Sequence, residues 1–367
     1  MKLKSLKNTK LDLTNKKVLL RVAYDIKPIN NKLEDISRIK ATLPTIKYLL
    51  KKNATIFLLT WIGRPQGVNK KLSTKLHAQT LEQLLEHKVT HLPDCIGPKV
   101  KKAIQESKSG QIYMLENVRF HKEEHTKNSN FAKNLSQGYD LLVFDAFPGA
   151  HRDTPSTTLI QKYLPTILGS YTKNEIKNLS NLLKNPKSPF TLIIGGAKIK
   201  DKLGVIKNLI NKTDNILIGG AAANPLLAFQ GIDIKNSLTQ KIKRPTWLNS
   251  KKIHLPIDFL SKNGKILDIG PLTIESWQEI IKNSKSILWS GPLGLFEQPP
   301  FHNGTTQVAK AITNSKAHSI IGGGDTITAI NQLKIPKKFT HISLAGGAML
   351  DFLSGIPLPT LKSLTTN

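Results

Sequence analysis

The sequence predicts an α/β protein with two domains, each built on a parallel sheet. Apolar, strand-like runs alternate with amphipathic, helix-like segments along the whole chain, and this order is typical of parallel sheets covered by helices. The 367 residues suffice for two domains of roughly 150 residues each. Most strand-like runs of the second half lead straight into small or glycine-rich residues, which is typical of the turns that follow strands in open α/β sheets.

In the first half, the expected strands are separated by segments with helical periodicity. Residues 37–52 carry apolar side chains on one helical face, and residues 74–85 form a second expected helix. The expected strands are Val18–Val22, Thr55–Thr60, Val89–Leu92, Ile112–Leu115 and Leu141–Phe144.

In the second half the same alternation returns after a long helix expected at Thr172–Lys184. Two prolines, Pro186 and Pro189, follow this helix and end it. We place the link between the domains there, so that residues 1–171 form the first domain, 172–188 the connecting helix and link, and 189–353 the second domain. The expected strands of the second domain are Phe190–Ile194, Asn215–Ile218, Lys252–Leu255, Ser286–Trp289, Ser319–Ile321 and His341–Leu344.

The composition excludes several classes of protein. Hydrophobic residues make up 39% and charged residues 22% of the chain, as in a globular protein rather than a disordered or fibrous one. A single cysteine, Cys95, excludes an internal disulfide and any site made of several thiolates. The polar, lysine-rich N-terminus resembles neither a secretory signal nor an anchor, and no stretch is apolar for long enough to span a bilayer. We therefore expect a cytoplasmic protein that does not bind membranes.

The basic residues carry more information than the net charge of +29. A strongly basic surface attracts anions of every kind. Arginine, however, occurs at only six positions among 54 basic residues, and its planar fork grips phosphate or carboxylate in a way that lysine does not. Five of the six are candidate ligands for a small, multiply charged anion: Arg21, Arg38, Arg64, Arg119 and Arg152.

Glycine clusters follow the expected strands of the second half. In a parallel sheet such loops meet at the carboxyl ends of the strands, where backbone N–H groups at helix starts bind phosphate. One such loop is usually only a turn between a strand and a helix, whereas several on one sheet favour a phosphate-binding site. They match neither the P-loop nor the dinucleotide pattern. The clusters are Gly195-Gly196, Gly219-Gly220, Gly291 with Gly294, Gly322-Gly323-Gly324 and Gly346-Gly347.

Arginines in the first half and phosphate-binding loops in the second suggest transfer of a phosphoryl group. This reaction needs alignment, positive charge around the moving group and a metal on the nucleotide. Lys198, Lys202 and Asp325 are the natural candidates in the second half. The plainer alternatives are a solvated helix face for the lysines and an ordinary N-cap for Asp325.

Many short motifs along nearly the whole chain resemble those of the phosphoglycerate kinase family. The resemblance implies two doubly wound domains joined by a hinge helix, with residues 354–367 returning to the first domain. It also implies reversible transfer between ATP and 3-phosphoglycerate with Mg²⁺ as cofactor, in glycolysis, by a monomer. The matching motifs include Ser37-Arg38-Ile39, Gly63-Arg64-Pro65, Asp94-Cys95-Ile96-Gly97-Pro98, Leu115-Glu116-Asn117-Val118-Arg119-Phe120-His121, Ala150-His151-Arg152, Gly195-Gly196-Ala197-Lys198, Asp201-Lys202, Gly291-Pro292 and Gly322-Gly323-Gly324-Asp325-Thr326.

The resemblance assigns roles to the candidates by position. The five arginines and Asp25 would bind 3-phosphoglycerate, and Arg38, Lys202 and Gly324 would act on the transferring group. Asp325 would serve the Mg-nucleotide. The residues that would bind the nucleotide are Gly196, Lys198, Lys202, Gly219, Pro292, Glu297, Gly323, Gly324, Asp325 and Thr326.

This chain also departs from the family pattern near the expected acceptor site. Ala23 and Asp25 stand where the family has Asp and Asn, and Trp61 stands where it has histidine. Pro148-Gly149 replaces a Gly-Thr pair. The changes at Ala23 with Asp25 and at Trp61 remove polar contacts to the hydroxyacid part of the substrate, while the five arginines remain. Further replacements are Thr154 for a common histidine, Ser290 for asparagine, and Leu344-Ala345 for Thr-Gly.

Two other functions remain open from the sequence. The departures would also suit a diverged kinase with another acidic substrate, or a relative that binds nucleotide without catalysis. The positive charge would suit nucleic acid, but the lysines are spread over almost every helix and aromatic residues make up only 6% of the chain, so a stacking platform for single strands is not expected. We expect small-molecule substrates and no specific nucleic-acid partner.

Overall fold

The computed structural model describes residues 2–6, 11–362 and 364–366, and its contacts divide the chain into two compact units. Unit 1 comprises Met1–Ile176 with Pro357–Asn367, and unit 2 comprises Lys177–Ile356. The division falls within helix α5, Ser170–Lys184. The domain limits expected from the sequence stay a prediction.

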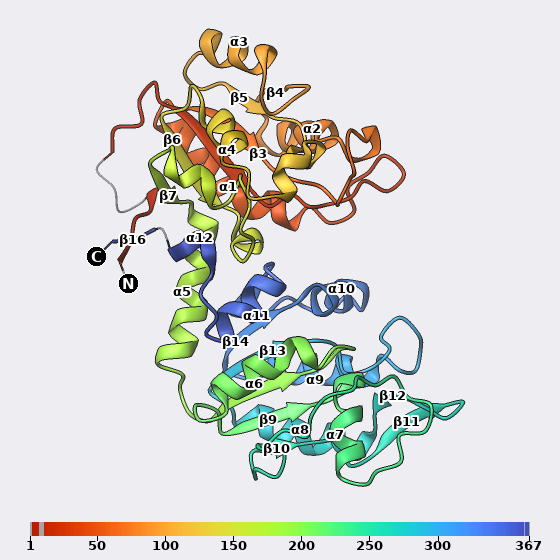
Figure 1. Ribbon diagram of the computed structural model, residues 1–367. Helices are drawn as coiled ribbons and strands as arrows, with labels where there is room; N and C mark the ends of the chain where they lie inside the picture. Colours follow the sequence, from red (N-terminus) through yellow and green to blue (C-terminus); the bar gives the residue numbers. More distant parts are fainter. Residues whose placement is uncertain (1, 7–10, 363, 367) are drawn as a thin grey trace. The chain divides into compact units, whose positions relative to one another are not determined.

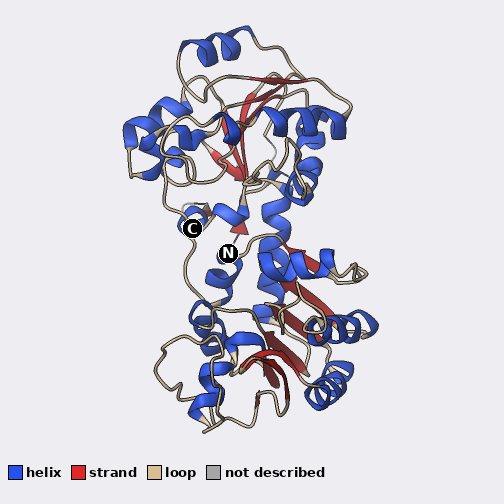
Figure 2. Ribbon diagram, turned by 90° about the vertical axis from the view of Figure 1, so that its right-hand side faces the viewer, coloured by secondary structure: helices blue, strands red, loops and turns tan. Residues whose placement is uncertain are grey.

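Unit 1 is built on a six-stranded parallel sheet in the order β4-β5-β3-β2-β6-β7. Figure 2 shows its strands lying between helices. The strands are β2 (Lys17–Val22), β3 (Thr55–Leu59), β4 (Val89–His91), β5 (Ile112–Met114), β6 (Leu141–Asp145) and β7 (Thr166–Leu168). The helices are α1 (Ser37–Lys51), α2 (Lys75–Leu85), α3 (Pro98–Glu106), α4 (Ser129–Ser136) and α12 (Pro359–Lys362), and β1 (Lys2–Leu3) pairs with β16 (Thr365–Thr366).

Unit 2 repeats this design with the strand order β10-β9-β8-β13-β14-β15, also parallel throughout. Figure 1 labels its elements from green to blue. The strands are β8 (Phe190–Ile194), β9 (Asn215–Ile218), β10 (Ile253–His254), β13 (Ser286–Ser290), β14 (His318–Gly322) and β15 (His341–Ser343), with a separate hairpin of β11 (Phe259–Lys262) and β12 (Lys265–Ile269). The helices are α6 (Leu203–Leu209), α7 (Asn224–Phe229), α8 (Pro271–Asn283), α9 (Asn303–Asn314), α10 (Gly324–Gln332) and α11 (Gly347–Leu353).

The central strands of both sheets are buried on both faces, because helices cover each side. All five residues of β3, β6, β8 and β13 are buried. Runs of apolar residues without alternation are typical of such strands. The predicted α/β class with two doubly wound parallel sheets is therefore confirmed.

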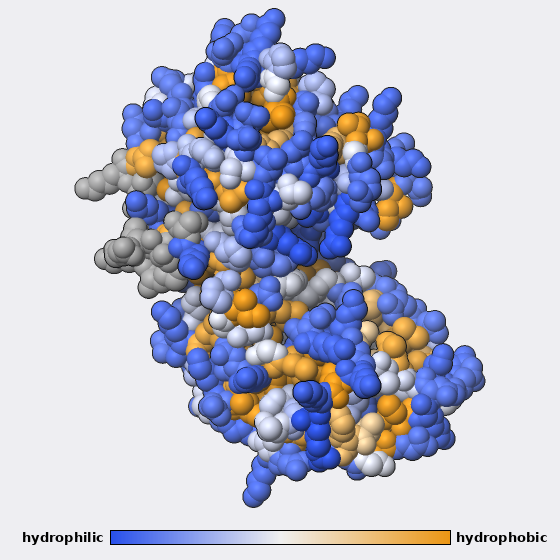
Figure 3. Space-filling model, in the orientation of Figure 1, coloured by the Kyte–Doolittle hydropathy of each residue, from blue (hydrophilic) through white to orange (hydrophobic). Residues whose placement is uncertain are grey.

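One face of the protein is mostly polar (Figure 3). Hydrophilic residues cover much of the face drawn in Figure 3, with smaller apolar patches between them. Within the part of the chain that the structure describes, no helix combines the length and apolar character needed to cross a membrane.

Candidate active site

In unit 1, the five predicted arginines lie at the carboxyl ends of the parallel strands or at a helix start. Arg21 is near the end of β2, Arg38 is in the first turn of α1, and Arg64 follows β3. Arg119 follows β5 in a short turn, and Arg152 follows β6. Since the carboxyl ends of parallel strands share one edge of the sheet, these guanidinium groups gather there.

Arg21 is fully buried, and polar groups hold its guanidinium from several sides. Its Nε donates to Ser156 Oγ at 3.2 Å, and its Nη1 donates to the carbonyl of Val22. Ser156 Oγ in turn donates to Glu124 Oε1 at 2.6 Å, and Glu124 is itself buried. Burial lowers the pKa of Arg21 to about 9, against the attraction of Glu124, so the guanidinium remains charged at neutral pH.

Arg119 is the half-buried member of the group. Its Nη1 donates to the Gly63 carbonyl at 2.6 Å and lies 3.9 Å from Asp25 Oδ2. Burial lowers its pKa, the nearby Asp25 and Glu124 oppose the shift, and the positive charges of Arg64 and Arg152 add to it. Arg119 thus interacts electrostatically with Arg21, Arg64 and Arg152, and these four arginines form one strongly cationic region.

Asp25 organises the loop that follows β2. Its Oδ1 accepts the Gly63 N–H at 2.8 Å, and its backbone carbonyl accepts a hydrogen bond from Arg38 Nη1 at 3.2 Å. Asp25 therefore interacts with two predicted substrate ligands: Arg38 through its backbone carbonyl and Arg119 through its carboxylate. Arg64 and Arg152 are exposed at the same edge, so an anion can reach their guanidinium groups.

In unit 2, a cavity of about 460 Å³ lies where the glycine loops end. Two of these loops are in backbone contact: Gly195 N–H donates to the Ser290 carbonyl at 2.9 Å, and Gly196 N–H donates to the Pro292 carbonyl at 2.6 Å. Gly291 has φ +98°, and a side chain there would collide with Gly195. The cavity is lined by Ala197, Lys198, Asp201, Lys202, Ser290, Gly291, Gly323, Gly324, Asp325, Thr326, Gly346, Gly347, Leu350 and Asp351.

Lys202 is the buried cation of this cavity, with 8% of its surface exposed. A Cβ at Gly196 would lie 3.4 Å from its Nζ, so the ammonium lies beside the Gly195-Gly196 loop. Burial lowers the pKa of Lys202, while Asp201 and Asp325 oppose that shift. Backbone N–H groups, an ammonium and carboxylates meet here, a combination that suits polyphosphate with a divalent cation.

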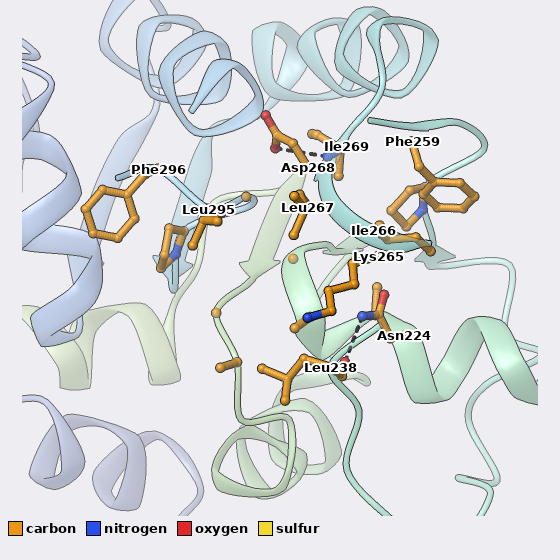
Figure 4. A pocket seen from close by; sticks show the side chains of 18 of the residues that line it. Asn224, Leu238, Phe259, Lys265, Ile266, Leu267, Asp268, Ile269, Leu295 and Phe296 are labelled. Carbon is orange, nitrogen blue, oxygen red and sulfur yellow. Dashed lines mark hydrogen bonds between the residues drawn. The ribbon is translucent and has the colours of Figure 1, made fainter. Parts of the chain in front are cut away.

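A second, more apolar cavity of about 310 Å³ shares Ala197 and Asp325 with the first. Figure 4 shows side chains around it from the β11–β12 hairpin, α7 and the loop after β13, and the hydrogen bond from the Asn224 amide to the Leu238 carbonyl. Its residues include Leu238, Pro256, Phe259, Ile266, Leu267, Pro292, Leu295, Phe296 and Glu297. An apolar cavity with a few polar groups at its edge is typical of a site for a small organic ligand such as a nucleoside.

Comparisons with known proteins agree with this arrangement. The family model described as phosphoglycerate kinase matches residues 8–356. This chain belongs to the phosphoglycerate kinase family. The phosphoglycerate kinase of Dictyoglomus turgidum is 41% identical to it over 96% of both chains, and that of Moorella thermoacetica is 37% identical over 97% of this chain and 98% of the relative. The solved phosphoglycerate kinase of Coxiella burnetii has a TM-score of 0.85 at 32% identity, covering 99% of both chains.

Most residues that the family resemblance assigned to the nucleotide line the two cavities. Lys198, Lys202, Gly323, Gly324, Asp325 and Thr326 line the larger one, and Gly196, Pro292, Glu297 and Asp325 line the apolar one. Gly219 is not among the lining residues. It is buried, and a Cβ there would lie 3.0 Å from Leu293. The next residue, Gly220, does line the apolar cavity. The individual roles stay predictions.

Sequence reasoning about the phosphoglycerate kinase motifs missed much of the apolar cavity. The β11–β12 hairpin supplies Phe259 and residues 265–269 of its lining. The dipeptide Asn263-Gly264 was an available signal, because Asn-Gly is typical of a two-residue hairpin turn. Asp201, quoted only as part of a matching motif, was given no role, and Asp351 was not singled out; both line the larger cavity.

Asp94, Cys95 and His121 place possible metal-ligating atoms within 4.8 Å of one another. His121 Nε2 lies 2.7 Å from Asp94 Oδ1, and this hydrogen bond raises the pKa of His121. Burial raises the pKa of the Cys95 thiol, and a protonated thiol is a poor metal ligand. We therefore interpret this cluster as structural: the hydrogen bond between Asp94 and His121 holds the loop after β4 in place.

Asp268, which lines the apolar cavity, makes the free energy of unfolding depend on pH. Its carboxylate accepts N–H groups from Gly304 at 2.7 Å and Ile269 at 2.9 Å, and burial raises its pKa to about 7. In the unfolded chain an aspartate titrates at about 3.9. The folded protein therefore holds a proton that the unfolded chain has lost, and the free energy of unfolding falls as pH rises from about 4 to about 7.

Asp268→Asn should remove this dependence. Between about pH 4 and about pH 7, the free energy of unfolding of wild type is expected to fall by up to about 1.4 kcal/mol per pH unit relative to that of the variant. Above about pH 7 the difference between the two proteins should no longer change with pH. Urea unfolding at several pH values, followed by tryptophan fluorescence, measures this. Asp233→Asn, an exposed position of the same unit, is the matched control. A difference between wild type and Asp268→Asn that does not change with pH would contradict the prediction.

Proposed function

We propose that the protein catalyses reversible transfer of the γ-phosphoryl group of ATP to the carboxylate of 3-phosphoglycerate, the reaction of glycolysis for which the family is named. The observation that carries the proposal is the polyphosphate-type cavity around Lys202, continuous in its lining with an apolar cavity of nucleoside type. The arginine cluster of unit 1 supports the choice of a small, phosphorylated, acidic acceptor.

The acceptor would bind to the arginine cluster of unit 1. The exposed Arg64 and Arg152 and the half-buried Arg119 offer forks for its phosphate group. Arg21 would contribute its positive charge to the site without direct contact with the acceptor, because its guanidinium is buried. Asp25 would help to orient Arg38 through the hydrogen bond to its carbonyl.

The nucleotide would bind to unit 2. The base and ribose would occupy the apolar cavity with Glu297 near the ribose, and the phosphates would lie along Gly196, Gly323 and Gly324. Thr326 supports this loop, since its Oγ1 accepts the Gly291 N–H at 2.7 Å and donates to the Gly322 carbonyl at 2.9 Å.

The donor set fits Mg²⁺, which prefers carboxylate and phosphate oxygens. Asp325, in the first turn of α10, lines both cavities and would hold the ion together with the phosphates. Bound there, Mg²⁺ would offset the charge of the nucleotide phosphates.

In the transfer, a carboxylate oxygen of the acceptor forms a bond to the γ-phosphorus. The bond between that phosphorus and the β,γ-bridging oxygen breaks, and ADP keeps the electron pair. Lys202, the N–H of Gly324 and Arg38 would stabilise the charge on the moving group, since positioned donors act most strongly on developing charge. Direct transfer requires the two substrates to meet, so the proposal includes a hinge motion around α5.

The proposal also includes a monomer that acts in the cytoplasm, where charged phosphorylated substrates are retained, and no specific nucleic-acid target. Any association with nucleic acid is expected to be electrostatic and to weaken steeply as salt is added.

A coupled assay tests the activity. Purified protein is mixed with Mg-ATP and 3-phosphoglycerate, and acyl phosphate is followed through a dehydrogenase that consumes it. We expect turnover that requires both substrates and the metal. No turnover above background, in a protein that is folded by circular dichroism, would overturn the proposal.

A further inference from the structure

Trp61 is the contact that two arginines of the acceptor site have in common. The guanidinium carbon of Arg21 lies 4.0 Å from the ring centroid of Trp61, and that of Arg119 lies 4.2 Å from it. Trp61 itself is 6% exposed. Both distances are within the range at which a cation is attracted to an aromatic face.

The face of Trp61 compensates for an incomplete set of hydrogen bonds around the buried guanidinium of Arg21. Arg21 Nη2 is buried and, among the described residues, has no hydrogen-bond partner. An unpaired, buried donor of a charged group is costly. The electron-rich face of Trp61 is a further favourable surface for this guanidinium, in addition to its hydrogen bonds and to the attraction of Glu124. Those hydrogen bonds run to Ser156, Val22 and Leu59.

Arg119 has a different need, because it lies among like charges. The nearby positive charges of Arg21, Arg64 and Arg152 oppose the placing of its guanidinium. Asp25, at 3.9 Å, is a distant counter-charge, and the Gly63 carbonyl fixes one nitrogen. The indole face fixes the plane of the guanidinium without neutralising its charge, and so leaves that charge for an anion.

The indole fits because residue 149 has no side chain. A Cβ at Gly149 would lie 3.0 Å from Cη2 and 3.1 Å from Cζ2 of Trp61. Gly149 ends the short turn Phe147–Gly149 after β6. A side chain there would require the indole to shift by a few tenths of an ångström, so the present position of Trp61 depends on the glycine at residue 149.

We propose that Trp61 is a positioning residue for the anion site: its ring holds Arg21 and Arg119 in place, and Gly149 provides the space for it. The inference rests on the proposed function for its substrate. It assigns to this chain an aromatic device where the resemblance led us to expect a histidine and a threonine.

Substitutions at Trp61 in the whole 367-residue chain test the role of the ring. Trp61→Leu removes the aromatic face and keeps apolar bulk, whereas Trp61→Phe keeps an aromatic face. We expect Trp61→Leu to weaken the binding of inorganic phosphate, measured by calorimetry, by about tenfold. The KM for 3-phosphoglycerate should rise equally, with kcat and the KM for ATP within about twofold of wild type. Trp61→Phe should stay within about threefold of wild type in all four quantities.

Gly149→Ala tests the same idea without touching the core residue, in case Trp61→Leu fails to fold. It should weaken phosphate binding severalfold in wild type and have no further effect in Trp61→Phe, whose smaller ring leaves room for the methyl group. Equal effects of Gly149→Ala in both backgrounds would overturn the coupling. Equal losses in Trp61→Phe and Trp61→Leu, or no loss in either, would overturn the role of the ring.

Fluorescence separates this inference from the proposed function. Subtracting the Trp61→Phe spectrum from that of wild type isolates the emission of Trp61, and phosphate should change it. Trp247→Phe, a substitution in unit 2 outside both cavities, is the matched control and should leave the phosphate response intact. A phosphate response of Trp61 without turnover would sink the proposed function alone. Turnover without any such response would sink the inference alone.

Discussion

Lys202→Met is expected to lower kcat about 100- to 1,000-fold, as loss of a positioned transition-state charge does. Methionine keeps most of the length and apolar stem of lysine and removes the charge. Lys202 is 8% exposed, and burial opposes its charged state. The fold does not need a charge at this position, and the thermal unfolding temperature should stay the same or rise.

The matched control for this substitution is Lys207→Met, an exposed lysine of the adjacent helix α6 that does not line either cavity. It should keep kcat within twofold of wild type. Initial rates at varied ATP and 3-phosphoglycerate separate the two kinetic parameters. If Lys202→Met retained more than a fifth of the wild-type kcat, the assignment of Lys202 to the transferring group would be wrong.

The parts of the fold predicted best are those whose signal is local. The buried strands β3 and β8 read as continuous apolar runs, and the structure has them at Thr55–Leu59 and Phe190–Ile194. The short strand β7, Thr166–Leu168, was missed because three residues after a proline carry no periodicity. The pairing of β1 with β16 joins two-residue strands from opposite ends of the sequence, and no local pattern could reveal it.

The arginine cluster of unit 1 was predicted from a different kind of signal, the choice between arginine and lysine. In a chain with 54 basic residues, the rarity of arginine marked the residues that gather at one edge of the first sheet. The same argument could not separate the buried Arg21 from the exposed Arg64 and Arg152. Burial depends on packing against Trp61 and on the buried Glu124, and these contacts come from loops after different strands.

The lining of the apolar cavity was predicted least well, because it depends on side chains that share no motif. Leu238, Phe259 and Leu295 lie far apart in the sequence and look like ordinary core residues. Asp268 was the one charged residue in the run Ile266–Ile269. A carboxylate within such a run indicates a buried hydrogen-bonding role, but we did not draw this inference from the sequence. In the structure Asp268 accepts the N–H groups of Gly304 and Ile269.

Replacing Arg38 by methionine is the second change expected to have a large effect, a fall in kcat of about 100-fold or more. Arg38 is the second residue of α1 and is half-buried. Its Nη1 donates to the carbonyl of Asp25 at 3.2 Å, which fixes part of the guanidinium through an acceptor without a formal charge. Arg38→Lys keeps the charge without the planar fork, and its kcat should therefore fall between those of wild type and Arg38→Met.

Lys40→Met, two residues along the same helix and exposed, removes one positive charge outside the site and should change kcat less than twofold. The three variants are compared at saturating substrates, with circular dichroism to show that α1 is retained. The order wild type, Arg38→Lys, Arg38→Met follows from a need for both charge and geometry. If Arg38→Lys matched wild type, charge alone would suffice; if Arg38→Met matched Lys40→Met, Arg38 would have no part in the transfer, and the charge on the phosphoryl group would be stabilised from unit 2 alone.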